Sequence, residues 1–119
     1  MTESQIKTSL KELNSLVING KLMDAFDKYY HDEVEMQENS NTPVKGKDTN
    51  RKREVEFLAN VTEFRNASVS GLAVNGNTSF VVWSYDYTHR EWGVRNYTQV
   101  SVQHWKDGKI IREQFFYGN

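Results

Sequence analysis

The chain has no cysteine and only one proline among its 119 residues. Without cysteine it can form neither disulfide bonds nor thiolate nucleophiles, and metal sites with cysteine ligands are excluded. Its net charge of -1 provides no overall field that attracts nucleic acid or an acidic membrane surface. The sequence also has no apolar run long enough to cross a bilayer, and its polar start is unlike a secretory signal. We therefore expect a cytoplasmic protein that binds neither nucleic acid nor membranes.

The composition is that of a folded domain with a large share of aromatic rings. Hydrophobic residues make up 37% and charged residues 26%, an ordinary balance for a globular protein. The length suits one domain that spans residues 1–119. Aromatic residues reach 13%. Large rings suit a small core, and they also suit a concave site for a partly apolar ligand.

The N-terminal segment carries the signals of an amphipathic helix. Thr2 and Gln5 fit a capping box, and apolar residues then recur at helical spacing over residues 6–17. Gly20 tolerates the left-handed conformation that commonly ends a helix. We expect the first helix to end there.

Two further helices are predicted before residue 63. The first covers residues 22–30, with its apolar and aromatic side chains on one side. After a loop that contains Pro43, Asp48 or Thr49 can cap the next helix. Its expected buried stripe consists of Val55, Leu58, and Val61 or Thr62.

The rest of the chain has the period of β-strands. Apolar residues alternate with polar ones from residue 34 to residue 38. Residues 67–74 and 78–88 are joined by an Asn-Gly pair, and residues 96–105 and 109–117 by an Asp-Gly pair, both strong hairpin signals. Two or three helices followed by a meander of long strands predict an α+β fold, with helices packed on one face of a curved antiparallel sheet.

Three segments resemble a known superfamily in the order expected of it. Residues 29–34 (YYHDEV) resemble the entry to its first strand, residues 43–47 (PVKGK) the segment before its third helix, and residues 105–111 (WKDGKII) its last hairpin. The chain is similar over nearly its whole length to the nuclear transport factor 2-like superfamily, in its SnoaL-like and ketosteroid-isomerase-like branch. The resemblance implies a cone-shaped, strongly curved sheet on two to three N-terminal helices, with a pocket at the open end. Members include isomerases, cyclases, epoxide hydrolases, dehydratases and non-catalytic proteins, so the fold leaves function open.

Glu38 is the first candidate for a catalytic residue. Val34 and Met36 mark the inner face of the first strand, and Glu38 continues that face. A carboxylate at the end of a buried face is unfavourable unless it is partnered or functional, and desolvation there favours a general base. The resemblance implies the same role, because ketosteroid isomerases carry their proton-abstracting carboxylate at this point. The alternative is a surface glutamate at a frayed strand end.

Glu113 is the second candidate. If residues 107–108 form the turn of the last hairpin, Val102 lies opposite Glu113 on the inner face, with Phe115 and Tyr117 beside it. Glu38 and Glu113 then form an acid–base pair if their environments separate their pKa values. The alternative is a structural carboxylate that pairs with His104 or a backbone donor. The outer face of this hairpin is expected to carry Gln99, Ser101, Gln103, Arg112 and Gln114.

Aromatic side chains are expected to line the pocket. The strand of residues 80–88 has two registers, one with Trp83, Tyr85 and Tyr87 inward and one with Val82, Ser84 and Asp86 inward, and we favour the first. The alternative role for these rings is in the core or in a dimer contact. The predicted ligand-binding residues are Tyr30, Met36, Trp83, Tyr85, Phe115 and Tyr117.

The sequence also departs from the family's catalytic patterns. The oxyanion-binding tyrosine of the isomerases corresponds to a position near Asn14, and their second acid to Val100–Val102, where no acid occurs. The catalytic aspartate of cyclases and epoxide hydrolases corresponds to about Phe115. These differences argue against steroid isomerisation and epoxide opening.

Three functions remain. The protein binds a partly apolar small molecule, or it is a proton-transfer enzyme of isomerase, cyclase or dehydratase type that uses Glu38, or it is a non-catalytic homodimerising or docking domain that uses its outer sheet face. The three histidines are scattered, so we expect no metal, and no fingerprint of a cofactor site occurs. The resemblance implies a homodimer, because members often pair through the outer face of the sheet.

Overall fold

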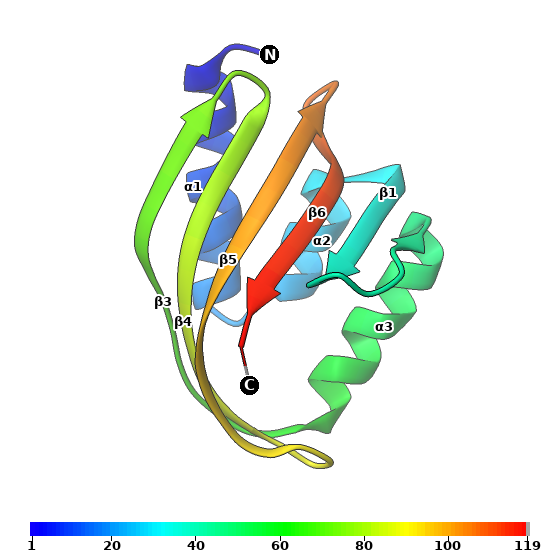
Figure 1. Ribbon diagram of the computed structural model, residues 1–119, viewed down its shortest axis with the longest axis vertical. Coiled ribbons are helices and arrows are strands. Elements are labelled where there is room, and N and C mark those ends of the chain that lie inside the picture. Colours follow the sequence, from blue (N-terminus) through cyan, green and yellow to red (C-terminus); the bar gives the residue numbers. More distant parts are fainter. Residues whose placement is uncertain (119) are drawn as a thin grey trace.

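The computed structural model describes residues 1–118 and contains three helices and a six-stranded sheet (Figure 1). The helices are α1 (Glu3–Ile18), α2 (Leu22–Tyr29) and α3 (Lys47–Asn60). The strands are β1 (Tyr30–Glu38), β2 (Val44–Lys45), β3 (Val61–Asn75), β4 (Thr78–His89), β5 (Gly93–Lys106) and β6 (Lys109–Tyr117). Within residues 1–118, none of the helices combines the length and the apolar character that crossing a membrane requires.

The sheet is curved, and the helices lie on its concave side (Figure 1). Its strand order is β2-β1-β6-β5-β4-β3. The predicted α+β fold is confirmed, but the sheet is mixed rather than wholly antiparallel, because β1 runs parallel to β6. A tight turn would require antiparallel neighbours, whereas the long connection through α3 and the β3–β5 meander allows a parallel pair.

One extra residue in β6 decides which side chains of the last hairpin face inward. The predicted pairing of Lys106 with Lys109 is present, but the register shifts between His104 and Trp105. Beyond this bulge every pair moves by one position, and the side chains of β6 change faces, so that Ile110 and Glu113 both point inward. Strand β5 itself alternates regularly, with Gln99, Ser101 and Gln103 on the same inner face as the buried Trp105, and Glu113 pairs with Gln103 rather than with Val102.

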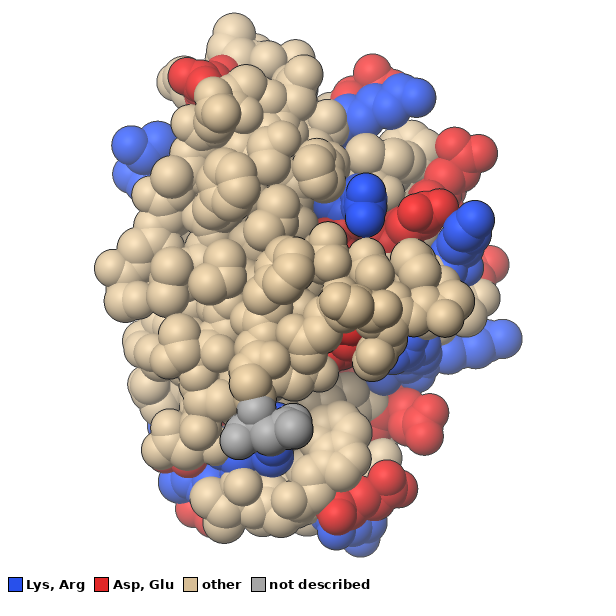
Figure 2. All heavy atoms as spheres, in the orientation of Figure 1, with Lys and Arg blue, Asp and Glu red and all other residues tan. Residues whose placement is uncertain are grey.

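This register corrects the predicted outer face. Gln99 and Gln103 are buried on the concave side, so the expected docking surface built on them is wrong. The outer face instead presents Val100 and Val102, and neighbouring strands add further apolar side chains to it. Figure 2 shows that few charged side chains lie over β3 to β6, whereas charges gather on the side of β1 and α3. The apolar residues of this outer patch are Phe80, Val82, Val100, Val102 and Phe116.

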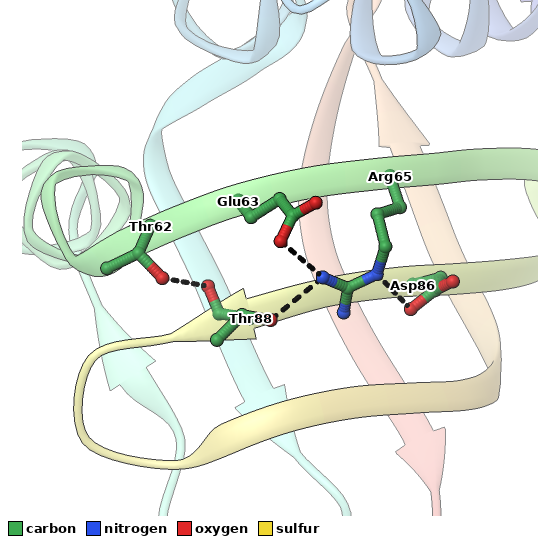
Figure 3. Close-up of polar contacts among 5 residues, drawn as sticks. All are labelled: Thr62, Glu63, Arg65, Asp86 and Thr88. Atoms are coloured by element: carbon green, nitrogen blue, oxygen red, sulfur yellow. Dashed lines mark hydrogen bonds and ion pairs between the residues drawn. The ribbon is translucent and has the colours of Figure 1, made fainter.

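The long arm of β3 and β4 owes its bend to three register shifts along β3. Bulges of this kind bend a strand and increase its twist. Arg65, the residue skipped by the second shift, donates hydrogen bonds to Asp86 (2.9 Å) and Thr88 (2.8 Å) of β4. It also pairs with Glu63 at 3.2 Å, so one guanidinium holds the two strands together at the bend (Figure 3).

Helix α3 presents a different face to the sheet from the one predicted. It begins after Gly46, whose φ of 93° favours glycine, and not at Asp48 or Thr49. The predicted buried stripe is wrong, because Val55 and Leu58 are 45% and 39% exposed. Its other members lie beyond the helix in β3, where Val61 is half-buried and Thr62 is exposed.

The inward face of α3 is polar and aromatic instead. Asn50 is buried and donates to the carbonyl oxygens of Val44 (3.0 Å) and Gly46 (2.9 Å), which anchors the start of the helix. Glu54 and Phe57 follow it along the same side. A helix that borders a cavity can carry such residues, since they need not fit a close-packed core.

Helix α1 is built as the sequence predicts. The Thr2 hydroxyl accepts from the Gln5 backbone nitrogen at 3.1 Å, and the Gln5 side chain accepts from the Thr2 nitrogen at 2.8 Å. Its apolar stripe is buried against the sheet, but Asn14, only 5% exposed, is buried with it. Neither side-chain atom of the Asn14 amide has a hydrogen-bond partner among residues 1–118.

We predict that Asn14→Leu raises the free energy of unfolding by about 1–2 kcal/mol, because it removes a buried amide that lacks partners. Urea denaturation measures the change, and Asn96→Leu, an exposed asparagine of β5, is the control that should change stability little. A destabilised Asn14→Leu protein would show that the amide is satisfied, for example by a buried water.

Candidate functional site

A cavity of about 610 Å³ lies between the concave face of the sheet, helix α3 and parts of α1 and α2. This volume accommodates a molecule of several rings. The side chains that line it include many aromatic rings, with carboxyl and amide groups among them. Such a combination is typical of sites for partly apolar small molecules.

All six predicted ligand-binding residues line this cavity. Strand β4 adopts the favoured register, with Trp83, Tyr85 and Tyr87 turned inward. The rings of Trp83 and Tyr85 stack with their centroids 5.2 Å apart, and Tyr97 and Tyr117 extend the aromatic wall across β5 and β6. Their role in binding stays a prediction.

Glu113 lies deep in the cavity and is only 2% exposed. Its two carboxyl oxygens accept hydrogen bonds from the Tyr30 hydroxyl and from the Gln103 amide nitrogen, the latter at 2.9 Å. The alternative partner His104 lies on the outer face beside Thr78. Burial raises the pKa of Glu113 to about 7, although both hydrogen bonds favour the ionised form.

The hydrogen bonds continue from Glu113 into the core. Ser79 donates to the Gln103 side-chain oxygen at 2.6 Å, and the Trp105 indole nitrogen donates to the Ser79 hydroxyl at 2.8 Å. All three residues are buried, so the amide of Gln103 is held in one orientation with its nitrogen toward Glu113. The position of the Glu113 carboxyl group is thereby determined from two sides.

Glu38 also lines the cavity, at the end of β1 and opposite Phe115 of β6. The hydroxyl of Tyr117 donates to its carboxylate. Burial and this hydrogen bond raise the pKa of Tyr117 to about 12, so the phenol stays protonated and Glu38 stays an acceptor. Asn39 supports the arrangement, since its side-chain oxygen accepts from the Tyr117 backbone nitrogen at 3.0 Å.

Glu54 of α3 is a third carboxyl group on the cavity, and sequence reasoning missed it. Burial raises its pKa to about 7, and the charges of Glu113 and Glu38 add to the rise. The available signal was the spacing of Asn50, Glu54 and Phe57, which places all three on one side of a helix. Glu54 instead looked like a counter-charge to the basic residues around it.

One end of the cavity is lined by an aromatic cluster from α3, the end of β4 and the β4–β5 connection. The rings of His89 and Trp92 stack at 3.7 Å, and Phe57 packs edge-on against Tyr87 at 5.5 Å. The Nδ1 atom of His89 accepts from the Glu91 nitrogen at 3.1 Å, which leaves Nε2 as the protonated ring nitrogen. Sequence reasoning missed this cluster because the long connection left its phase undetermined.

The arrangement can hold a flat ligand and exchange protons with it. At neutral pH, Glu54 and Glu113 are each divided between acid and carboxylate, while Glu38 accepts a hydrogen bond. Within residues 1–118, no three histidine, aspartate or glutamate side chains are placed to bind a metal ion together. Two positions correspond to catalytic residues of the resembling enzymes. Of these, Asn14 does not line the cavity, whereas Phe115 does.

Comparisons with known proteins agree with this architecture. The model of the SnoaL-like domain family matches residues 1–117. The structure superposes with a TM-score of 0.85 on a proposed SnoaL-like polyketide cyclase from Mesorhizobium loti, at 27% identity over 98% of this chain and 100% of the other. No curated protein matches the chain.

Two more distant structures share the fold. A proposed SnoaL-like polyketide cyclase from Jannaschia sp. CCS1 has a TM-score of 0.82 at 14% identity, covering 97% of this chain and 86% of the other. An LEH-like epoxide hydrolase from M. tuberculosis has a TM-score of 0.79 at 10% identity, covering 98% and 84%. The resemblance predicted from the sequence is confirmed.

We predict that the stability of the protein falls as the pH rises from about 5 to 8. Unfolded Glu113 ionises with a pKa of about 4.3, whereas the folded group holds its proton until about pH 7. The folded state therefore binds more protons in this window, and its stabilisation is lost as the pH passes the folded pKa. Between pH 5 and 8 the contribution of Glu113 to the free energy of unfolding falls by on the order of 2–3 kcal/mol.

Glu113→Gln tests this by urea denaturation at several pH values. A glutamine can donate to the Tyr30 hydroxyl and accept from Gln103, as the protonated acid does, so the variant should lose much of the pH dependence. Glu33→Gln, an exposed residue of β1, is the matched control. If the free energy of unfolding of Glu113→Gln falls with pH as steeply as that of the wild type, the pKa of Glu113 is not raised.

Proposed function

Because the chain belongs to the SnoaL-like domain family, we propose that it binds a partly apolar small molecule in its cavity and moves a proton on that molecule. The observation that carries the proposal is the set of carboxyl groups on an aromatic wall, two of which have a pKa of about 7. A general acid or base works best when its pKa lies near the working pH. The fold family and the pocket support binding, and the carboxyl groups favour catalysis.

Glu38 and Glu113 have complementary roles in this proposal. Glu38, with Tyr117 donating to one of its oxygens, uses the other to accept a proton from a carbon next to a carbonyl group. Glu113, in its protonated form, donates a proton to the carbonyl oxygen as the enol forms. Glu38 then returns its proton to a different carbon of a conjugated system while the enol oxygen gives its proton back to Glu113, which completes an isomerisation. In a cyclisation the same enol attacks a second carbonyl group, whose oxygen takes the proton from Glu38 while the enol oxygen returns its proton to Glu113.

Glu54 supports the division of roles. Its charge and those of Glu113 and Glu38 oppose one another, so full ionisation of all three groups is unfavourable near neutral pH. A large share of the molecules then retains a proton on Glu54 or Glu113 at neutral pH, where it is available for transfer. The name of the Mesorhizobium loti relative, a proposed polyketide cyclase, fits chemistry that begins with removal of a proton next to a carbonyl.

We predict that the protein accelerates hydrogen–deuterium exchange next to the carbonyl of cyclic hydrophobic ketones in D2O. Proton NMR follows the exchange for a panel of ketones that quench the fluorescence of Trp83, which lines the cavity. Glu38→Gln and Glu113→Gln should each slow the exchange about 100-fold or more, because each removes one proton-transfer group. Glu33→Gln should leave it unchanged. Saturable binding with no accelerated exchange by the wild type would reduce the function to binding alone.

A second function, homodimerisation, is favoured by the outer patch of Phe80, Val82, Val100, Val102 and Phe116. These side chains are neighbours across β4, β5 and β6, and Phe116 is 43% exposed. Contiguous apolar surface of this kind marks an interface in soluble proteins. A second copy of the chain is a suitable partner, since a two-fold axis brings the same patch together from both copies.

We predict that the wild type is a dimer in sedimentation equilibrium at micromolar concentration, and that Val100→Lys with Phe116→Lys makes it a monomer. Two charges at the centre of an apolar interface lose their hydration without gaining partners. Ser70→Lys, an exposed position of β3 outside the patch, is the control that should remain dimeric. A wild type that is strictly monomeric at high micromolar concentration refutes the dimer and leaves the pocket proposal intact.

A further inference from the structure

Arg95 is a cation on the aromatic wall of the cavity, on the inner face of β5. Its Nε atom is buried and has no hydrogen-bond partner among residues 1–118. No carboxylate of these residues forms an ion pair with its guanidinium group, whereas Arg51 and Arg65 both have such partners. The side chain is half-buried, so its charge is only partly hydrated.

The neighbours of Arg95 are tyrosines. Its guanidinium carbon lies 5.0 Å from the centroid of the Tyr97 ring, and it pairs with Tyr87 across the β4–β5 ladder. The hydroxyls of Tyr87 and Tyr97 lie 2.9 Å apart, and the ring of Tyr97 packs against that of Tyr117 at 5.6 Å. The group therefore consists of a planar cation and phenol hydroxyls, all of them able to donate hydrogen bonds.

A buried donor of a charged group is unfavourable while it lacks an acceptor. A guanidinium group matches the two oxygens of a carboxylate in a bidentate geometry, and the partly desolvated surroundings strengthen that pair. The cation–π contact with Tyr97 restrains the guanidinium group and reduces the entropy lost on binding.

The position of Arg95 along the sheet defines what such a ligand looks like. Arg95 lies four residues before Gln99, which pairs with Tyr117, the donor to Glu38. At about 3.3 Å per residue this is roughly 13 Å along the strand. Gln103, the partner of Glu113, lies a further four residues away.

The charges of the cavity are thus separated along its length. The three lining carboxyl groups that are not exposed, Glu38, Glu54 and Glu113, disfavour an anion in the deeper part, while Arg95 provides a cation near the aromatic end. The other lining carboxylates, those of Glu56, Glu63 and Glu91, are exposed to solvent, which screens their charges. A molecule with one acidic end can enter in only one favourable orientation, with its acid at Arg95 and its neutral part toward the carboxyl groups.

We propose that Arg95 binds a carboxylate group of the ligand, so that the substrates are elongated, partly apolar carboxylic acids whose reacting carbon is remote from the acid. This inference rests on the proposed function, since it assumes that the cavity is the binding site. It makes Arg95 the residue that determines specificity and orientation, and it assigns Arg95 no part in the proton transfer.

The test compares 2-naphthylacetate with 2-naphthylacetamide, which differ only in the charge and donors of the polar end. Isothermal titration calorimetry at pH 7 should give the wild type a preference for the carboxylate of about tenfold or more. Arg95→Gln should lose this preference through weaker carboxylate binding, with amide binding unchanged. Arg95→Lys keeps the charge but not the planar fork, and should show an intermediate preference.

Two further variants identify the cation. Arg90→Gln, an exposed residue that does not line the cavity, should retain the preference and controls for long-range charge effects. Loss of the preference in Arg53→Gln, the other arginine on the cavity, with Arg95→Gln unaffected, would overturn the assignment.

The remaining outcomes separate the inference from the proposed function. Equal affinity of the wild type for acid and amide refutes the carboxylate site and leaves the pocket proposal standing. Binding of neither probe, together with no response of Trp83 fluorescence to the ketone panel, refutes the pocket proposal and the inference with it.

Discussion

The buried hydrogen bonds of Glu113 connect the parts of the fold on which the cavity depends. Tyr30 at the start of β1 and Gln103 of β5 both donate to this carboxyl group, and Ser79 of β4 holds Gln103 in turn. These contacts require the bulge in β6, because only the shifted register brings Glu113 opposite Gln103 on the concave side. Without it, Arg112 would lie opposite Gln103 and Glu113 would point outward.

The curvature of the sheet creates the space in which these polar groups become useful. The bent arm of β3 and β4, held at the bend by Arg65, carries the aromatic wall away from α1. Helix α3 covers the remaining side with Glu54 and Phe57. A close-packed core would exclude buried carboxyl groups of this kind, whereas a cavity leaves them half-protonated at neutral pH and accessible to a ligand.

The two faces of the sheet are suited to different tasks. The concave face carries the carboxyl groups and Arg95, which are separated along the strands, so it can orient an asymmetric ligand. The outer face carries an apolar patch with few charges, which suits contact with another protein surface (Figure 2). Alternation along β5 assigns Gln99 and Gln103 to the first face and Val100 and Val102 to the second.

Local patterns in the sequence were sufficient for the elements and for some of the site. The capping box of α1, the period of β1 and the turn at residues 107–108 depend on neighbours a few positions apart, so they can be read without the fold. The inward position of Glu38 followed from such a pattern. Glu113 was placed inside correctly, but from a register that the bulge overturns.

Only the tertiary structure decided which residues meet. The bulge of β6 reverses the faces of that strand and brings Glu113 opposite Gln103, and no local signal in the sequence marks it. Glu54 and Arg95 line the same cavity because α3 and β5 both border it, and their burial comes from segments far away in the chain. The periodicity of a sequence indicates which side of a helix or strand is apolar, whereas a pocket places polar residues on the inner side. For this physical reason the sequence alone determined the helices and strands, but not which polar groups meet in the cavity.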